Sequence, residues 1–289
     1  MLLVLSLLWG GSYIFISVAV KELPALLIVF VRVILAVAIL IPIHLFVLGK
    51  LPGDKRTWIA AGGMSIINNV IPFSLIVFGQ HYVSASLASV INATTPLFGA
   101  VAMAAAGAEA LTGQRITGLL LGLAGVMVLR GPDIASFNTD SLGVLSLLLA
   151  SASYGVSGLW AKRKLAGIPP ITIATCQLLI SSLVMAVLAS TFSQPELLLG
   201  VSSNTWLALV GLAFLSTSIA YLLFFKIIEA AGASVVLLVT MLIPVSAIAM
   251  GTLFLGDKLT GLQLLGASII GVGLLVIDGR VLKLLGVRA

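Results

Sequence analysis

Apolar runs long enough to cross a lipid bilayer recur along the whole chain and constrain its fold more than any other feature. A membrane-spanning helix needs about 20 apolar residues, and short segments rich in charge, glycine or proline separate the runs. We therefore expect an all-α polytopic membrane protein with ten transmembrane helices. The predicted spans are residues 2–20, 25–48, 57–79, 83–106, 114–130, 140–161, 171–192, 205–226, 233–255 and 261–279.

Composition supports this class and excludes others. Of 289 residues, 61% are hydrophobic and 8% are charged, whereas soluble domains carry about 25% charged residues. The first apolar run begins at Leu2 without a charged leader, so we expect a first span and not a removable signal peptide. The sequence has no metal-ligand cluster, cofactor motif or ATP-binding loop, and its basic residues form no nucleic-acid-binding stripe. We expect no cofactor, no metal and no nucleic-acid partner.

Basic residues at the helix ends predict the orientation. Cytoplasmic loops of membrane proteins carry an excess of Lys and Arg, and the bias here is strong if both termini are cytoplasmic. The outer ends then carry only Lys21, Arg130 and Lys258. The inner ends carry Lys50, Lys55, Arg56, Arg115, Lys162, Arg163, Lys164, Lys226, Arg280, Lys283 and Arg288.

The chain also repeats itself when residue n is aligned with residue n + 148. Each half then has five helices, an odd number, so the halves are expected to be inverted relative to each other: residues 1–131, an outer connecting loop 132–139, and residues 140–289. Inverted repeats are typical of secondary transporters, whose substrate site lies near the midplane. The matching pairs include Ala85/Ala233, Ser86/Ser234, Pro96/Pro244, Glu109/Asp257, Gly113/Gly261, Gly118/Gly266 and Gly125/Gly273.

These repeated residues carry a family resemblance. The segment from Tyr82 (YVSASLAS) through Pro96 to EALTG at 109–113, with its second copy from Ala230 through Pro244 to DKLTG at 257–261, resembles the EamA-type drug/metabolite transporter superfamily. The resemblance covers essentially the whole chain and looks closest to bacterial exporters of aromatic and other amino acids. It implies ten helices, cytoplasmic termini, an inverted repeat and a multi-pass location in the bacterial cytoplasmic membrane.

Two prolines predict interruptions at matching places. Pro96 and Pro244 lie midway along the fourth and ninth spans, where proline removes a backbone donor and frees the carbonyl four residues earlier. Paired interruptions in two repeats point to a transport site, so we expect both to act as hinges. The alternative is a kink that packing alone satisfies.

Polar and aromatic side chains in the spans predict the lining of a central cavity. Neutral hydrogen-bonding groups beside aromatic surface suit a small zwitterion better than a polyanion. Close packing of small polar residues, or interfacial anchoring of the aromatic ones, is the competing interpretation. The predicted head-group ligands are Asn68, Asn69, Asn92, Tyr154 and Gln177; the predicted side-chain contacts are Trp9, Tyr13, Trp160 and Tyr221; His81 and Tyr82 lie at the outer turn.

Charged residues within or near the spans leave two questions open. Arg32 lies about seven residues inside its span, so it either snorkels outward towards Glu22 or attracts a substrate carboxylate at an outer gate. His81 is the only titratable switch expected near the pathway, while His44 is expected to be a solvated end residue. The nine acidic residues all lie in loops or near helix ends. A buried carboxylate is common in proton-driven transporters, so we expect a facilitator or exchanger.

An enzyme is the competing class. Gly155-Val-Ser-Gly158 is similar to the motif of rhomboid-type intramembrane proteases, in which Ser157 would be the nucleophile and would need a histidine base. His44 and His81 are predicted near opposite faces, which argues against it. The sequence therefore predicts a transporter, not an enzyme, that exports small metabolites, above all amino acids. Export of another metabolite, drug or lipid is the alternative, and the transporter is expected to act in the bilayer as a monomer or weak homodimer.

Overall fold

The computed structural model describes residues 1–110, 112–130, 139–231 and 233–278, and in this part every regular element is a helix. Residues 132–138 of the predicted connecting loop lie outside the described residues. Three of the elements (η1, η4 and η5) are π-helical and one (η3) is a 3₁₀ helix. The elements are α1 (Leu2–Ala19), α2 (Ala25–Leu48), α3 (Lys55–Met64), η1 (Ser65–Val70), α4 (Ile71–Gly79), α5 (Ala85–Asn92), α6 (Thr95–Ala105), α7 (Gly113–Arg130), α8 (Thr139–Lys164), α9 (Pro170–Phe192), η3 (Pro195–Gly200), α10 (Ser203–Ala213), η4 (Phe214–Ile219), α11 (Ala220–Ala231), α12 (Ala233–Met250), η5 (Gly251–Leu255) and α13 (Gly261–Asp278).

Eight helical segments of the described residues are long and apolar enough to cross a membrane. The helices at Gly113–Leu129 and Val239–Leu255 are apolar but shorter. Large apolar side chains such as Leu120, Leu183 and Leu207 are exposed along the helices, which suits a lipid environment and not water. The prediction of an all-helical, multi-pass membrane protein is therefore confirmed.

Short polar side chains begin several helices. Asp54 and Ser84 cap α3 and α5 by accepting hydrogen bonds from the backbone N–H groups of Thr57 (2.8 Å) and Leu87 (3.3 Å). Ser202 caps α10 in the same way through Thr205. Such caps satisfy amide donors that the first turn of a helix leaves unpaired. They explain why the spans begin at these residues.

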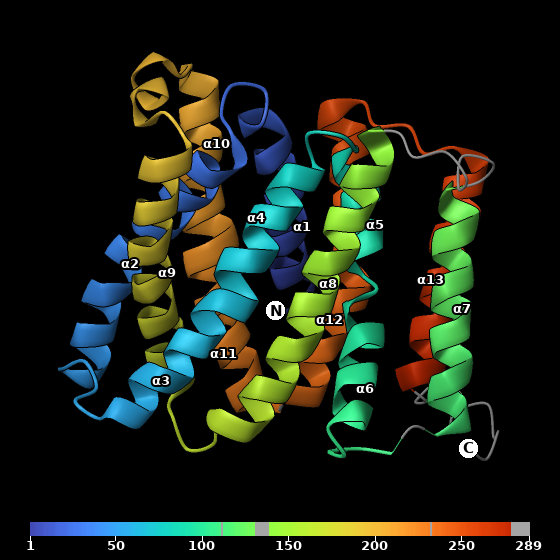
Figure 1. Cartoon of the computed structure of the whole chain (residues 1–289), viewed down its shortest axis with the longest axis horizontal. Helices are drawn as coiled ribbons and strands as arrows, with labels where there is room; N and C mark the ends of the chain where they lie inside the picture. Colours follow the sequence, from blue (N-terminus) through green and yellow to red (C-terminus); the bar gives the residue numbers. More distant parts are fainter. Residues whose placement is uncertain (111, 131–138, 232, 279–289) are drawn as a thin grey trace.

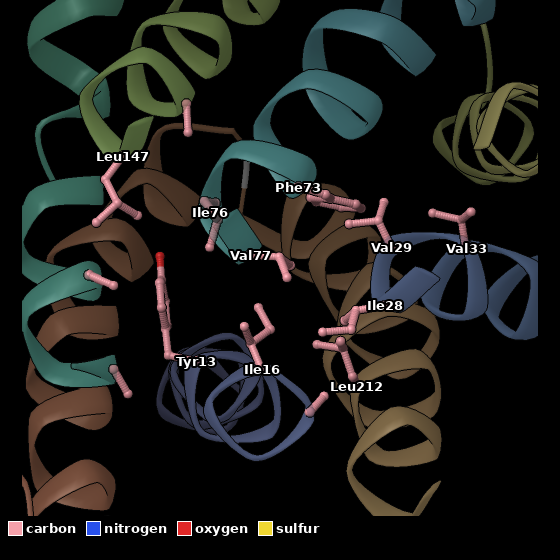
Figure 2. Packing of buried hydrophobic residues seen from close by; sticks show 14 of the residues in the cluster. Tyr13, Ile16, Ile28, Val29, Val33, Phe73, Ile76, Val77, Leu147 and Leu212 are labelled. Atoms are coloured by element: carbon pink, nitrogen blue, oxygen red, sulfur yellow. The ribbon is translucent and has the colours of Figure 1, made fainter. Parts of the chain in front are cut away.

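The most extensive helix contacts join the first half of the chain to the second. α1 packs against α10 and α12, while α8 packs against α4 and α6; α2 packs against α9, and α7 against α13 (Figure 1). Apolar residues of α1, α2, α4 and α10, including Tyr13, Ile16, Phe73 and Val77, form part of the core (Figure 2). Segments far apart in the sequence therefore meet at the centre of the bundle.

Glycines allow α7 and α13 to approach closely. A Cβ atom on Gly118 would lie 2.7 Å from the Gly273 carbonyl oxygen, and one on Gly125 would lie 2.8 Å from that of Gly266. The reciprocal contacts are equally short, so the two helices run antiparallel with their backbones touching. Small residues permit such contacts in membranes, where van der Waals packing drives helix association.

Candidate functional site

Two π-helical segments form the centre of the candidate site. η1 interrupts the third predicted span and η4 the eighth, and alignment by 148 residues places them within one residue of each other. In η4 the Thr217 and Ser218 hydroxyls donate to the carbonyls five residues earlier, Leu212 (2.8 Å) and Ala213 (3.0 Å), a spacing that matches the wider π turn. π segments occur frequently at functional sites.

Four of the predicted ligands meet in one hydrogen-bond network. Gln177 Nε2 donates to the Tyr221 hydroxyl (3.1 Å), which in turn donates to Asn69 Oδ1 (3.4 Å). Asn68 Nδ2 lies 3.5 Å from the same hydroxyl. The residues come from η1, α9 and α11, so this network joins segments of both halves of the chain.

Two serines extend the network. Ser181 Oγ accepts from Asn69 Nδ2 (3.1 Å) and donates to the Gln177 carbonyl (2.6 Å). Ser157 Oγ lies 3.0 Å from Asn68 Oδ1 and 2.7 Å from the Tyr154 carbonyl. No histidine contacts Ser157 among the described residues, so the arrangement that a protease would need is not present there.

Arg32 lies in the same region and is 6% exposed. Its Nε donates to Thr217 Oγ1 (3.0 Å), and its Cζ lies 3.6 Å from the centre of the Phe73 ring. Tyr13, Tyr154 and Tyr221 lie in its surroundings. The prediction that Arg32 snorkels towards Glu22 is wrong, because the side chain instead points into the bundle, where an aromatic face and a hydroxyl hold it.

Glu22 has other partners. Its carboxylate accepts from the Ser202 backbone N–H (2.8 Å) and from the hydroxyls of Ser202 and Thr205 at the start of α10. These hydrogen bonds, with that of the Ser202 hydroxyl first, lower the pKa of Glu22 below its usual value. Glu22 therefore links the α1–α2 turn to α10, and it forms no ion pair with Arg32.

Tyr13 and Asn92 form a second small polar group. The Tyr13 hydroxyl lies beside the Asn92 side chain, and the Asn92 Oδ1 atom also accepts from Ser151 Oγ (3.3 Å). Asn92 ends α5, so α1, α5 and α8 meet here. Tyr13 is buried and Asn92 is half-buried, and their pairing depends on tertiary packing.

The indoles of the two predicted tryptophan contacts have other partners than these polar groups. Trp9 packs against Phe224, with ring centres 5.6 Å apart. Trp160 Nε1 donates to the Ala60 carbonyl (3.0 Å), and the indole fills the space beside Gly63. In this conformation both indoles make packing contacts between helices.

The two prolines behave differently. The fourth span breaks between α5 and α6, next to Pro96, and the Thr94 and Thr95 hydroxyls donate to the carbonyls of Ile91 (2.7 Å) and Asn92 (2.8 Å). By contrast, α12 continues through Pro244, which corrects the prediction of an interruption there. The physical reason is that Leu242 and Ile243 replace the two threonines and have no donor for a freed carbonyl. The hinge roles themselves stay predictions.

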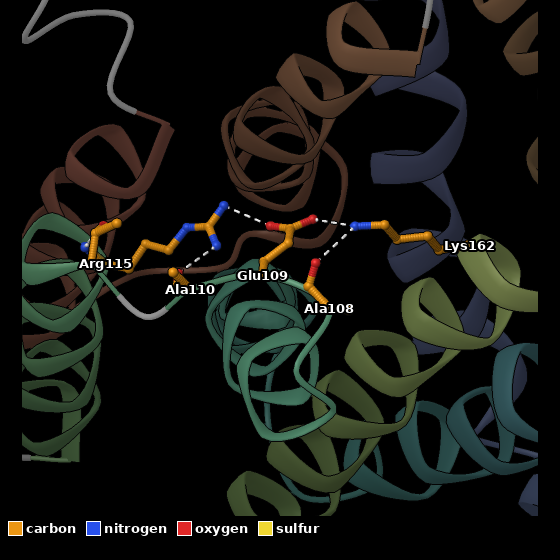
Figure 3. A network of polar contacts seen from close by, with 6 residues as sticks. Ala108, Glu109, Ala110, Arg115 and Lys162 are labelled. Atoms are coloured by element: carbon orange, nitrogen blue, oxygen red, sulfur yellow. Dashed lines mark hydrogen bonds and ion pairs between the residues drawn. The ribbon is translucent and has the colours of Figure 1, made fainter.

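Both ends of the bundle are tied by carboxylates. Near the predicted inner end, Glu109 forms ion pairs with Arg115 (2.6 Å) and Lys162 (2.9 Å) (Figure 3); these hydrogen-bonded cations lower its pKa, Lys162 first. Near the outer end, Asp257 accepts from the backbone N–H (3.0 Å) and hydroxyl (2.7 Å) of Ser86. Glu109 and Asp257 occupy matching positions in the sequence repeat. Their contacts lie at opposite ends of the bundle.

Two hollows at helix ends, of about 460 and 320 Å³, are lined by other residues than the predicted ligands. One lies beside Glu109 and Arg115, and the other beside Asp54 and Thr172. His44 lies near the second, but it is buried, with Nε2 3.1 Å from the Lys50 carbonyl oxygen. The expectation that His44 is solvated is therefore wrong, because the loop after α2 folds back over it.

Sequence reasoning missed Phe73 and Ser181 as parts of the polar centre, whereas Ser65 lies on the same predicted polar face as Asn68 and Asn69. Ser181 follows Gln177 by one helical turn, and this spacing was a usable signal. Ser65 Oγ lies 2.9 Å from Ser181 Oγ. Phe73 looks like any core aromatic in the sequence, and only its contact with Arg32 distinguishes it.

His81 and Tyr82 occupy the turn after α4, where His81 is exposed and Tyr82 packs edge-on against Phe78. Neighbouring protein atoms remove part of the hydration of the His81 imidazole, which lowers its pKa below the ordinary value. The neutral imidazole therefore predominates at neutral pH. We expect His81→Gln to leave the pH profile of transport unchanged from about pH 7 to pH 8, measured as efflux from proteoliposomes. A flattened profile in this variant would instead identify His81 as a coupling residue.

The helices and their buried polar centre define a class, multi-pass helical membrane proteins of the transporter type. Within this class, the chain belongs to the EamA-like transporter family, whose model matches residues 1–131 and 141–278. The family identifies it as a membrane transporter and agrees with the resemblance found in the sequence.

Similar proteins support the family and leave the substrate open. The chain is 23% identical over 256 residues to the uncharacterized transporter YoaV of Bacillus subtilis, covering 88% of this chain and 87% of the relative. It is 23% identical over 259 residues to protein PagO of Salmonella typhimurium, covering 86% and 82%. A crystal structure with a TM-score of 0.66 and 17% identity covers 98% of this chain and 97% of its own, and it shows the same fold.

Proposed function

We propose that this transporter exports small organic metabolites, above all neutral and aromatic amino acids, across a bacterial cytoplasmic membrane by alternating access. The observation that carries the proposal is the network of Asn68, Asn69, Gln177 and Tyr221, which joins the two halves at the π segments. Neutral donors and acceptors beside aromatic rings match the polar head and apolar side chain of such a substrate. None of these four side chains is positively charged, so the network does not favour a polyanionic substrate.

Ten transmembrane helices in two inverted repeats are part of this proposal, with both termini on the inner side. Exchange of the halves converts the contacts of α1 with the eighth and ninth predicted spans into those of α8 with the third and fourth. It also converts the contact of Gly118 with Gly273 into that of Gly266 with Gly125. α7 and α13 occupy equivalent positions in the two repeats and pack antiparallel. This arrangement favours a two-fold axis perpendicular to both helices, and such an axis would lie in the membrane plane.

The ties at the two ends suggest how access alternates. Asp257 holds Ser86 at the outer end, and Glu109 holds Lys162 and Arg115 at the inner end. If the contacts at one end break while those at the other end remain, and the fourth span bends at the break beside Pro96, one side of the bundle would open. Pro244, within a continuous helix, would act as a softer second hinge.

A facilitator or exchanger fits the charges better than a proton-driven pump. Among the described residues, no carboxylate lies midway along a predicted span, where proton-coupled carriers commonly hold one. The substrate would then move down its own concentration gradient. Another metabolite, a drug or a lipid remains the alternative cargo of the same fold.

The test is flux from proteoliposomes loaded with labelled leucine or phenylalanine, with and without an imposed pH gradient. We expect saturable efflux that does not depend on the gradient and is absent from protein-free vesicles. Flux that requires the gradient would contradict the facilitator proposal and leave transport standing. If no amino acid moves, the substrate proposal fails and a wider metabolite, drug and lipid panel becomes the next measurement.

A further inference from the structure

Arg32 is a buried cation with no acidic partner in the part of the chain that the structure describes. Burial of an ionised side chain is costly unless an opposite charge or several hydrogen bonds compensate it. The ion pairs of the described residues involve Arg115 and Lys162 with Glu109, and none involves Arg32. Its Nε has one hydrogen bond, to Thr217, and its two terminal nitrogens donate to no described residue.

The surroundings hold the guanidinium in place without neutralising it. The Thr217 hydroxyl donates its proton to the Leu212 carbonyl, so its free lone pair faces Arg32 Nε. The Phe73 ring covers one face of the guanidinium at 3.6 Å. A guanidinium held by Nε and one face keeps its terminal N–H groups available for a planar anion such as a carboxylate, which it binds through two parallel hydrogen bonds.

An unsatisfied acceptor lies beside Tyr221. Gln177 is 2% exposed, and its Oε1 atom has no hydrogen-bond partner among the described residues, while its Nε2 donates to the Tyr221 hydroxyl. Thr217, which contacts Arg32, and Tyr221, which contacts Gln177, are four residues apart in η4 and α11, about one helical turn. A cation that lacks an anion and an acceptor that lacks a donor among the described residues therefore contact neighbouring positions of one span, an arrangement that suits a zwitterion.

We propose that Arg32 binds the carboxylate of the transported molecule and that Gln177 Oε1 accepts a hydrogen bond from its ammonium group. This inference rests on the proposed transport function and specifies its substrate class as molecules with a single carboxylate. Amines that lack the carboxylate bind weakly, because they would bring a second positive charge next to Arg32. Dianions bind weakly too, because Arg32 is the one cation of the described residues within the polar centre.

The test compares three probes of similar size on the purified protein: phenylalanine, 3-phenylpropionate without the ammonium group, and phenethylamine without the carboxylate. In counterflow of labelled phenylalanine, we expect 3-phenylpropionate to compete and phenethylamine not to compete. Arg32→Gln should weaken binding of both carboxylates by about tenfold or more, since charged hydrogen bonds are lost. Arg32→Lys should retain part of the affinity, and Arg56→Gln, at an exposed arginine, should behave as wild type.

Thermal stabilisation of each variant by 3-phenylpropionate separates this inference from the transport proposal. Stabilisation that Arg32→Gln abolishes supports the carboxylate site even if wild-type protein moves no amino acid. Conversely, phenylalanine flux that Arg32→Gln leaves unchanged, or equal competition by phenethylamine, overturns the carboxylate site while transport stands. Stabilisation of wild type and Arg32→Gln to the same extent overturns it as well.

Discussion

Replacement of Gly266 by valine is expected to destabilise the protein strongly and to abolish transport. A Cβ atom at Gly266 would lie 2.6 Å from the Gly125 carbonyl oxygen and 2.7 Å from the Leu129 backbone nitrogen. These are backbone atoms of the facing helix α7, which no side-chain rotation can move away. Overpacking of this kind costs roughly 1–3 kcal/mol or more, and we expect a lower thermal unfolding temperature in detergent.

Gly271→Val is the matched control for this prediction. Gly271 lies on the same helix, α13, and a Cβ atom there would meet no atom within 4 Å. The substitution therefore changes the same residue type without touching α7. Equal unfolding temperatures for the two variants would show that the close contact of α7 with α13 contributes nothing to stability.

Asn92→Leu is expected to abolish transport while the protein stays folded. Leucine is close to asparagine in size but removes the Oδ1 atom that accepts from Ser151 and the amide beside the Tyr13 hydroxyl. Asn92 is only half-buried, so the packing loss is small. The measurement is initial efflux of labelled phenylalanine from proteoliposomes, together with the elution profile of the purified variant.

Asn204→Leu provides the comparison, because Asn204 is exposed at the start of α10. It should transport at the wild-type rate. Transport by Asn92→Leu at that same rate would exclude Asn92 from the substrate path. A misfolded Asn92→Leu protein would instead identify its contacts with Tyr13 and Ser151 as structural.

The local pattern of apolar and polar residues predicted the helices closely. The runs at 2–20 and 25–48 became α1 and α2, and the polar stripe of Asn68 and Asn69 was expected to line the interior. These features depend on neighbours in the sequence, since hydrophobicity and helix caps act over one or two turns. For the same reason, the break next to Pro96 was predictable.

Features that depend on contacts between distant segments were not predictable in this way. The same proline rule failed at Pro244, where Leu242 and Ile243, directly before it, have no hydroxyl. The snorkelling of Arg32 was a sound expectation for an isolated helix, but Phe73 and Thr217 offered a better environment inside the bundle. Trp9 and Trp160, expected beside a substrate, pack against Phe224 and near Gly63.

By itself, the sequence determined the class of this protein, because a chain with so many apolar runs and so few charges has no stable fold outside a bilayer. Its internal repeat also indicated a two-part transporter. Only the tertiary structure decided which polar groups meet: it brought Asn69, Gln177 and Tyr221 together and left Arg32 with no acidic partner among the described residues. The physical reason is that hydrogen bonds and ion pairs act over a few ångströms, and only helix packing brings residues this far apart in the sequence to that distance.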